Sequence, residues 1–246
     1  MTKDQVYGKQ ANRVRPSEVS VTSGSKFIGA TFLYMALGLL VTFGVIGLLG
    51  AMLSIFKSEI ATDTYIYIFI AALILYIPVM IWVHFSAARN GKTVGPAFFT
   101  YSIVMGALIS PAVLFLDFGL VAVSFGTTCL AFAVMALIAW TSKKSLSNLA
   151  IIGMGLLFGG LILSIFNLIM YFIIGFQPLY WLVSFLFFFA IILLTIFDLK
   201  RVKEIAMSGV ATKNMAMLCA LNLYVDFIYI FLRVLRIVAI IAGNRR

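Results

Sequence analysis

The sequence contains few charged residues and very few of the residues that build most soluble active sites. Only 11% of its 246 residues are charged, with five prolines, two cysteines and one histidine. Cys129 and Cys219 both lie in apolar runs, so neither a disulfide framework nor a zinc site is indicated. His84 cannot hold a metal alone, and we expect an interfacial residue rather than a proton relay. No phosphate-binding glycine loop or nucleophile elbow is present, so we expect neither enzymatic activity nor a cofactor.

Hydrophobic residues make up 63% of the chain and are gathered into long uncharged runs. This composition predicts an all-α, polytopic membrane protein with the lipid bilayer as its first partner. The formal net charge of +10 could indicate nucleic-acid binding. We exclude that interpretation because the basic residues cluster in short segments between the apolar runs, as the positive-inside rule expects.

Seven membrane spans are predicted within a single domain of residues 27–242, preceded by a polar tail of residues 1–26. The first run is too long for a signal-peptide core, and we expect it to remain as an anchor. Residues 145–197 carry no charge, and a break at Gly175–Pro178 divides them into two spans. The predicted spans are Phe27–Phe56, Thr64–Ala87, Val94–Leu116, Phe118–Trp140, Leu149–Ile174, Leu179–Asp198 and Ala216–Ala242.

The distribution of lysine and arginine predicts the orientation. The tail and the even-numbered loops hold most of the basic residues, whereas the odd-numbered loops hold only Lys57. The tail and the even loops, including Lys200, Arg201 and Lys203 after the sixth span, are therefore expected in the cytoplasm. Seven crossings would place the C-terminus outside, but Arg245 and Arg246 argue for a last helix that ends partway, and the sequence leaves both alternatives open.

The last apolar run is unusual because it carries Asp226 near its middle. An ionised carboxylate at bilayer depth costs roughly 2.5–3.5 kcal/mol, so it must face protein or water. Asp198, at the end of the preceding run, is the expected partner. The midpoint of these two positions is 212, inside the predicted turn Ser208–Lys213. In an antiparallel hairpin both carboxylates would then lie roughly 21 Å from the turn, level with one another.

Two carboxylates that meet in a dry interior are expected to share a proton or to bind a cation through their oxygens. Alternatively, Asp226 forms an internal ion pair with Arg233, two turns further on, and Asp198 merely ends its helix. Asn222, one turn before Asp226, could hydrogen-bond it, and Asn167 could bridge two helices. An aspartyl protease is disfavoured because Leu-Tyr-Val precedes Asp226 where those enzymes carry Gly-x-Gly.

The run LNLYVDFIYIFLRVLR resembles the last-helix signature of the Bax inhibitor-1 family, the transmembrane Bax inhibitor motif proteins. Asp226 matches the aspartate of that signature, while Tyr229 replaces its usual asparagine. Phe197-Asp198 is similar to the Tyr-Asp at the end of the family's sixth helix. Supporting matches in family order are Lys92-Thr93-Val94-Gly95, Ser110-Pro111, Phe125-Gly126-Thr127 and Phe166-Asn167, and the resemblance spans residues 27–240.

This resemblance implies a seven-helix bundle whose last helix is enclosed by the other six. For bacterial relatives it implies a pH-sensitive calcium leak in which the paired aspartates share a proton and an arginine latches onto them. Arg89 matches that arginine, although it could be an ordinary positive-inside anchor. A glutamate found in the second helix of some relatives aligns with Pro78, so Asp198 and Asp226 alone would serve calcium or another cation.

The resemblance also leaves a second function open. The family includes regulators of membrane-bound proteases and of cell death, so the chain could act as a membrane interaction protein without transport. In that case the polar tail would dock a protein partner. The short tail and compact loops favour the inner membrane of a bacterium.

Overall fold

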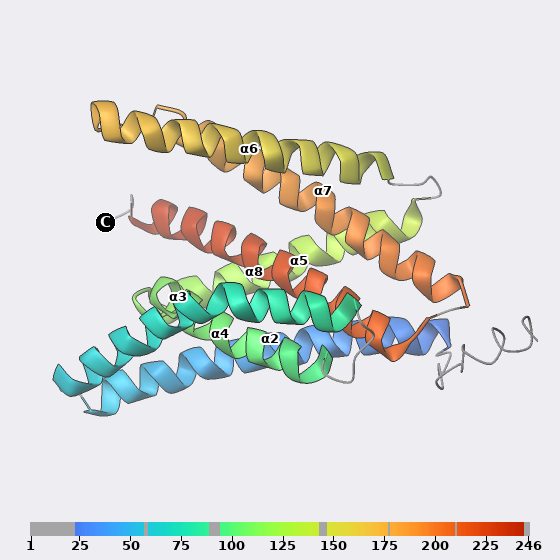
Figure 1. Cartoon of the computed structure of the whole chain (residues 1–246), viewed down its shortest axis with the longest axis horizontal. Helices are drawn as coiled ribbons and strands as arrows, with labels where there is room; N and C mark the ends of the chain where they lie inside the picture. Colours follow the sequence, from blue (N-terminus) through green and yellow to red (C-terminus); the bar gives the residue numbers. More distant parts are fainter. Residues whose placement is uncertain are drawn as a thin grey trace, which may run out of the picture.

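The computed structural model describes residues 23–56, 59–88, 94–142, 147–176, 178–209 and 211–243. These residues form seven helices, and no strand occurs within them (Figure 1). In chain order the helices are α2 (Gly24–Phe56), α3 (Glu59–Ala88), α4 (Val94–Leu114), α5 (Phe118–Thr141), α6 (Ser147–Ile174), α7 (Tyr180–Met207) and α8 (Lys213–Gly243). The predicted all-α fold is confirmed. The first 22 residues, most of the predicted tail, lie outside the described ranges.

The predicted helix breaks form where the local chemistry requires them. Gly175 follows α6 and Gly209 follows α7, with φ angles of 69° and 72°. A side chain would be strained in this left-handed region, which suits glycine. The hydroxyl of Thr212 accepts a hydrogen bond from the backbone N–H of Met215 at 3.2 Å and so caps the start of α8. The turn between the two predicted aspartate helices is therefore confirmed.

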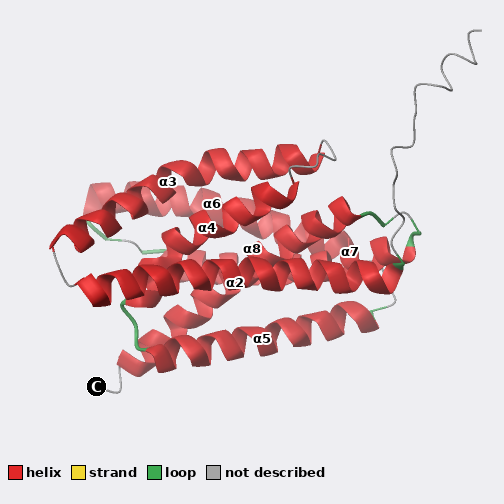
Figure 2. Cartoon of the chain, turned by 90° about the horizontal axis from the view of Figure 1, so that it is seen from below, coloured by secondary structure: helices red, strands yellow, loops and turns green. Residues whose placement is uncertain are grey.

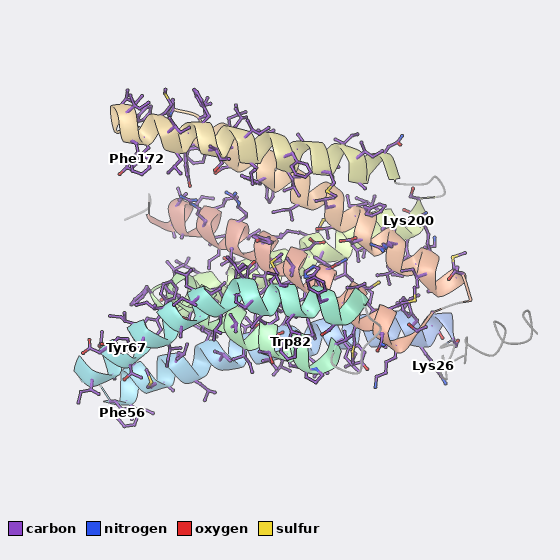
Figure 3. All side chains as sticks on the ribbon, in the orientation of Figure 1. Lys26, Phe56, Tyr67, Trp82, Phe172 and Lys200 are labelled. Carbon is purple, nitrogen blue, oxygen red and sulfur yellow. The ribbon has the colours of Figure 1, made fainter. Side chains whose placement is uncertain are left out.

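Helices α2 to α7 are each long and apolar enough to cross a membrane. Many of their large apolar side chains point outward, among them Phe56, Tyr67 and Phe172 (Figure 3). Outward apolar side chains are costly in water but favourable against lipid. The chain is accordingly a multi-pass membrane protein that contacts the bilayer.

The last helix, α8, is not among these six spans and lies inside the bundle. It packs on α2, α5, α7, α4 and α3, whereas α6 packs mainly on α7 (Figure 2). Leu223, Tyr224, Ile228 and Phe231 of α8 are fully buried. The Tyr224 hydroxyl lies 2.6 Å from Thr42 Oγ1 of α2, which ties the two helices together. The predicted central position of the last helix is confirmed.

The helix α8 extends from the α7–α8 turn to the α4–α5 turn. Gly243 lies beside Leu116 and Asp117, at the turn between α4 and α5. At the opposite end, Gly24 is packed so closely on Ala206 that an added Cβ would approach its carbonyl oxygen to 2.5 Å. The two ends of the described chain therefore lie at opposite ends of the bundle (Figure 1). The C-terminal end of α8 therefore reaches the α4–α5 turn, while the side of the membrane on which the C-terminus lies stays a prediction.

The basic residues that follow Asp198 lie on the same helix, because α7 continues to Met207. Lys200 is buried and its Nζ donates a hydrogen bond to the carbonyl of Ser142 (Figure 3). Lys203 Nζ donates to the carbonyl of Trp140 at 2.7 Å. Both ammonium groups thus satisfy carbonyls at the C-terminal end of α5, where the helix dipole favours positive charge.

Candidate functional site: an acidic cavity beside the last helix

A cavity of about 590 Å³ lies beside the middle of α8 and contains both predicted aspartates. We call it the acidic cavity. Helices α3, α4, α6, α7 and α8 all contribute to its wall. The lining side chains are Tyr76, Met80, Val83, His84, Tyr101, Met154, Leu157, Asp198, Leu221, Asn222, Val225, Asp226 and Tyr229. It is a mostly apolar enclosure with a few polar groups, as is common for sites that bind small ligands.

Asp226 is the most constrained group in this cavity. Its Oδ2 atom is buried and has no hydrogen-bond partner among the described residues. The hydroxyl of Thr195, on α7, interacts with the Asp226 carboxylate. The Thr195 hydroxyl also donates a hydrogen bond to the carbonyl of Ile191 at 2.7 Å. A buried carboxylate oxygen without a donor is costly when charged, which favours a bound proton or a cation at this position.

Asp198 faces the same cavity from α7, and its charge interacts with that of Asp226. Like charges this close in a low-dielectric interior repel one another. The nearest positive charge comes from Arg201, one turn along α7 toward the end of the bundle. The structure thus brings the two predicted carboxylates together, with Arg201 on one flank.

The two carboxylates are not level in the way that the sequence predicted. Asp198 lies nine residues before the end of α7, and Asp226 lies thirteen residues after the start of α8. The difference of four residues corresponds to about 6 Å along a helix axis. The prediction was wrong on this point because α7 ends at Met207 and α8 begins at Lys213, so the midpoint between the two helices is position 210 rather than 212. Both side chains nevertheless reach the acidic cavity.

The other predicted site residues do not all lie in the acidic cavity. Asn222 lines the acidic cavity, but the expected hydrogen bond to Asp226 is absent among the interactions of that carboxylate. Arg233 does not pair with Asp226: it donates to Ser184 Oγ of α7 at 3.2 Å and lines a different cavity. The ion-pair alternative is therefore not supported. The proposed latch, Arg89, lies outside the described residues.

Asn167 is not part of the cavity. It is buried in α6, and its Oδ1 accepts a hydrogen bond from the backbone N–H of Leu179 at 3.1 Å. Leu179 immediately precedes α7, so Asn167 ties the end of α6 to the start of α7. This is the helix-bridging role that we expected from an asparagine inside a span.

Sequence reasoning missed the polar residues that surround the pair from other helices. The side chain of Tyr76, on α3, interacts with those of Tyr101, on α4, and Tyr229, on α8. His84 also faces the cavity, although we expected it at the interface, and its Nδ1 lies 2.8 Å from the Met80 carbonyl. A signal was available, because Tyr76, Met80, Val83 and His84 follow the spacing of one helix face.

The donors in this cavity suit a proton or a passing cation better than a tightly held metal. No group of three or more His, Cys, Asp or Glu side chains that could hold a metal occurs in the described ranges. Calcium takes six to eight oxygen ligands, of which two carboxylates supply only part. Water, tyrosine hydroxyls and the Asn222 amide would have to complete the shell. Such a site would release an ion readily.

Comparison with known proteins agrees with this architecture. A relative in Lactococcus lactis subsp. lactis (strain IL1403), the uncharacterized protein YrjE, is 31% identical over 165 residues, which cover 65% of this chain and 67% of the relative. The family model described as "Inhibitor of apoptosis-promoting Bax1" matches residues 24–244, which include all seven described helices in full. The chain therefore belongs to the Bax inhibitor-1 family.

Proposed function

We propose that this protein is a pH-sensitive cation leak of the membrane, in which Asp198 and Asp226 form a proton-sharing gate. The observation that carries the proposal is the acidic cavity, which holds both carboxylates within a membrane-embedded bundle and leaves Asp226 Oδ2 without a hydrogen-bond partner in the described part of the chain. Carboxylates inside a membrane protein are costly and are typical of ion and proton pathways.

The gate works by competition between a proton and a cation for the same oxygens. With one proton shared, the pair carries a single negative charge and the two carboxylates attract one another through that proton. When the proton leaves, the two negative charges repel and favour a cation between them. His84, Tyr76, Tyr101 and Tyr229 surround the pair, and Arg201 flanks it. Calcium is the cation we propose, with other cations as the alternative.

Ion flux into liposomes that contain a calcium dye tests this proposal between pH 6 and pH 8. We expect a pH-dependent flux from the wild type and a flux independent of pH from Asp226→Asn, because an amide can neither share the proton nor release it. The matched control is Asp63→Asn, the same exchange at an exposed position near the start of α3. This variant should retain the wild-type profile. Equal pH profiles for wild type and Asp226→Asn would contradict the gate.

A second function is a membrane interaction protein that regulates a membrane-bound protease or a cell-death pathway without transport. The family description as an inhibitor of apoptosis-promoting Bax1 favours it. In this proposal the polar segment before α2 docks a partner protein, and deletion of residues 1–23 should abolish partner capture while the flux remains. Loss of flux with retained partner binding would count against this function.

A further inference from the structure

A second cavity, of about 390 Å³, lies between the first half of α7 and the last half of α8. We call it the basic cavity. It lies toward the end of the bundle that holds the C-terminal end of α8, whereas the acidic cavity lies nearer the α7–α8 turn. The lining side chains are Tyr180, Trp181, Ser184, Phe185, Phe188, Arg233, Arg236, Ile237 and Ile240.

Two arginines give this cavity a positive charge that its wall does not balance. Arg233 is partly buried and bonded to Ser184, and Arg236 lies with its guanidinium 5.0 Å from the centre of the Tyr180 ring. The two guanidinium charges act unfavourably on one another. No aspartate or glutamate is among the lining residues. Cations in a membrane-embedded wall without a counter-charge favour an anionic ligand.

Tyr180, the first residue of α7, adds a further donor to the same cavity. Its hydroxyl is buried and has no hydrogen-bond partner among the described residues. The start of α7 also places the positive end of the helix dipole on this side of the bundle. Two arginines and a free hydroxyl together suit a phosphate group.

The remaining wall of the basic cavity is apolar and open to the bilayer. Only α7 and α8 form it, and Trp181, Phe185, Ile237 and Ile240 are all exposed on the surface of the bundle. Arg236 lies seven residues before the end of α8, which is roughly 10 Å, so its long side chain can reach toward the headgroup layer. A ligand in this cavity therefore has access to a charged end and to apolar side chains along its length.

We propose that the basic cavity binds an anionic phospholipid of the surrounding bilayer. The phosphate lies between Arg236, Arg233 and the start of α7, and the Tyr180 hydroxyl donates to it. An acyl chain lies along Phe185, Phe188 and Ile237. This site does not depend on the proposed ion leak, since it shares no lining residue with the acidic cavity. A free phosphate ion has the same charged chemistry but would leave the apolar wall unused.

Trp181 provides a direct measurement because it lines the basic cavity. The other two tryptophans, Trp82 and Trp140, are replaced by phenylalanine in the full-length protein, which is reconstituted in phosphatidylcholine vesicles. Quenching of Trp181 fluorescence by brominated phosphatidylglycerol is then compared with quenching by brominated phosphatidylcholine. We expect preferential quenching by the anionic lipid, with a relative binding constant about five-fold above that of the neutral lipid or higher.

Substitutions separate this site from general attraction between a basic protein and anionic lipid. Arg233→Gln with Arg236→Gln should bring the relative binding constant close to one, while Arg233→Lys with Arg236→Lys should retain most of the preference. The single variant Arg236→Gln leaves the Arg233–Ser184 hydrogen bond in place. It should lose part of the preference for the anionic lipid. Arg201→Gln removes the same charge at the opposite end of α7 and should have no effect.

Three outcomes would overturn the proposal. The first is equal quenching of Trp181 by both lipids in the parent protein. The second is a preference that persists in Arg236→Gln at its full value. The third is loss of the preference on addition of inorganic phosphate but not of chloride at equal ionic strength, which would assign the site to a free phosphate ion.

Discussion

The acidic cavity and the basic cavity share α7 and α8 but differ in how the protein encloses their charges. Five helices contribute to the acidic cavity, whereas only two form the basic cavity. Asp226 is short, and its Oδ2 atom is buried without a hydrogen-bond partner among the described residues. Arg236 is long and exposed, and it lies near the end of its helix. The same hairpin thus carries one charge that must be neutralised locally and one that can meet an external anion.

This difference explains why the two cavities suit different ligands. A carboxylate in the interior can lower its cost by taking a proton, so an acidic pair at that depth becomes sensitive to pH. Arginine keeps its proton under all physiological conditions, so the basic cavity must find an anion instead. We therefore expect pH to control the first cavity, and lipid composition and salt to control the second.

The largest predicted effect is on the affinity of the acidic cavity for calcium. The cation can occupy the pair only after the shared proton has left, so affinity falls as the pH is lowered. Displacement of one proton gives up to about a ten-fold change per pH unit, or up to about 100-fold between pH 8 and pH 6. Calcium titration calorimetry of the detergent-solubilised protein measures this change. Asp198→Asn should remove the pH dependence together with most of the binding.

The lipid preference of the basic cavity provides the contrasting measurement over the same pH range. Guanidinium groups stay charged and the lipid phosphate remains anionic, so the relative quenching of Trp181 should be constant from pH 6 to pH 8. If calcium affinity is also constant over this range, pH does not distinguish the two cavities, and the shared proton has no role in the acidic one.

Much of the fold could be predicted from the sequence because it depends on local patterns. Long uncharged runs defined the helices, and glycines at positions 175 and 209 marked two of the helix ends. The last-helix motif, with Asp226, indicated both the family and the central position of α8. These features require only composition, spacing and short-range chemistry, which a single sequence displays directly.

The parts that could not be predicted depend on contacts between helices that are distant in sequence. The spacing of Tyr76 and His84 places them on one face of α3, but they line the cavity of Asp226 only because α3 packs beside α8, and their own segment does not show which helix that face meets. Lys200 donates to a carbonyl at the end of α5, 58 residues earlier in the chain, which its own segment does not indicate. Arg233 was a candidate partner of Asp226, yet Ser184 on the neighbouring helix takes its hydrogen bond.

Two tyrosine substitutions, one in each cavity, compare the cavities by their effect on protein stability. Tyr76→Phe removes a hydroxyl that interacts with Tyr101 and Tyr229 and should lower the free energy of unfolding by about 1 kcal/mol. Tyr180→Phe removes a buried hydroxyl that has no partner among the described residues and should be neutral or slightly stabilising in detergent without anionic lipid. Thermal unfolding followed by circular dichroism measures both. A larger loss for Tyr180→Phe would show that the basic cavity is closed by interactions within the protein.

The smallest predicted effect concerns salt, which should act on the two cavities unequally. Ions in solution screen exposed charges far more than enclosed ones, and the Debye length shortens several-fold between 0.05 and 0.5 M salt. The preference of the basic cavity for phosphatidylglycerol should therefore fall about two- to three-fold over this range. The midpoint of the pH profile of ion flux should move by less than about 0.3 pH units, since the carboxylate pair lies within five helices. A midpoint that shifts strongly with salt would mean that bulk solvent reaches Asp226, and the enclosure that distinguishes the acidic cavity would then be absent in the working protein.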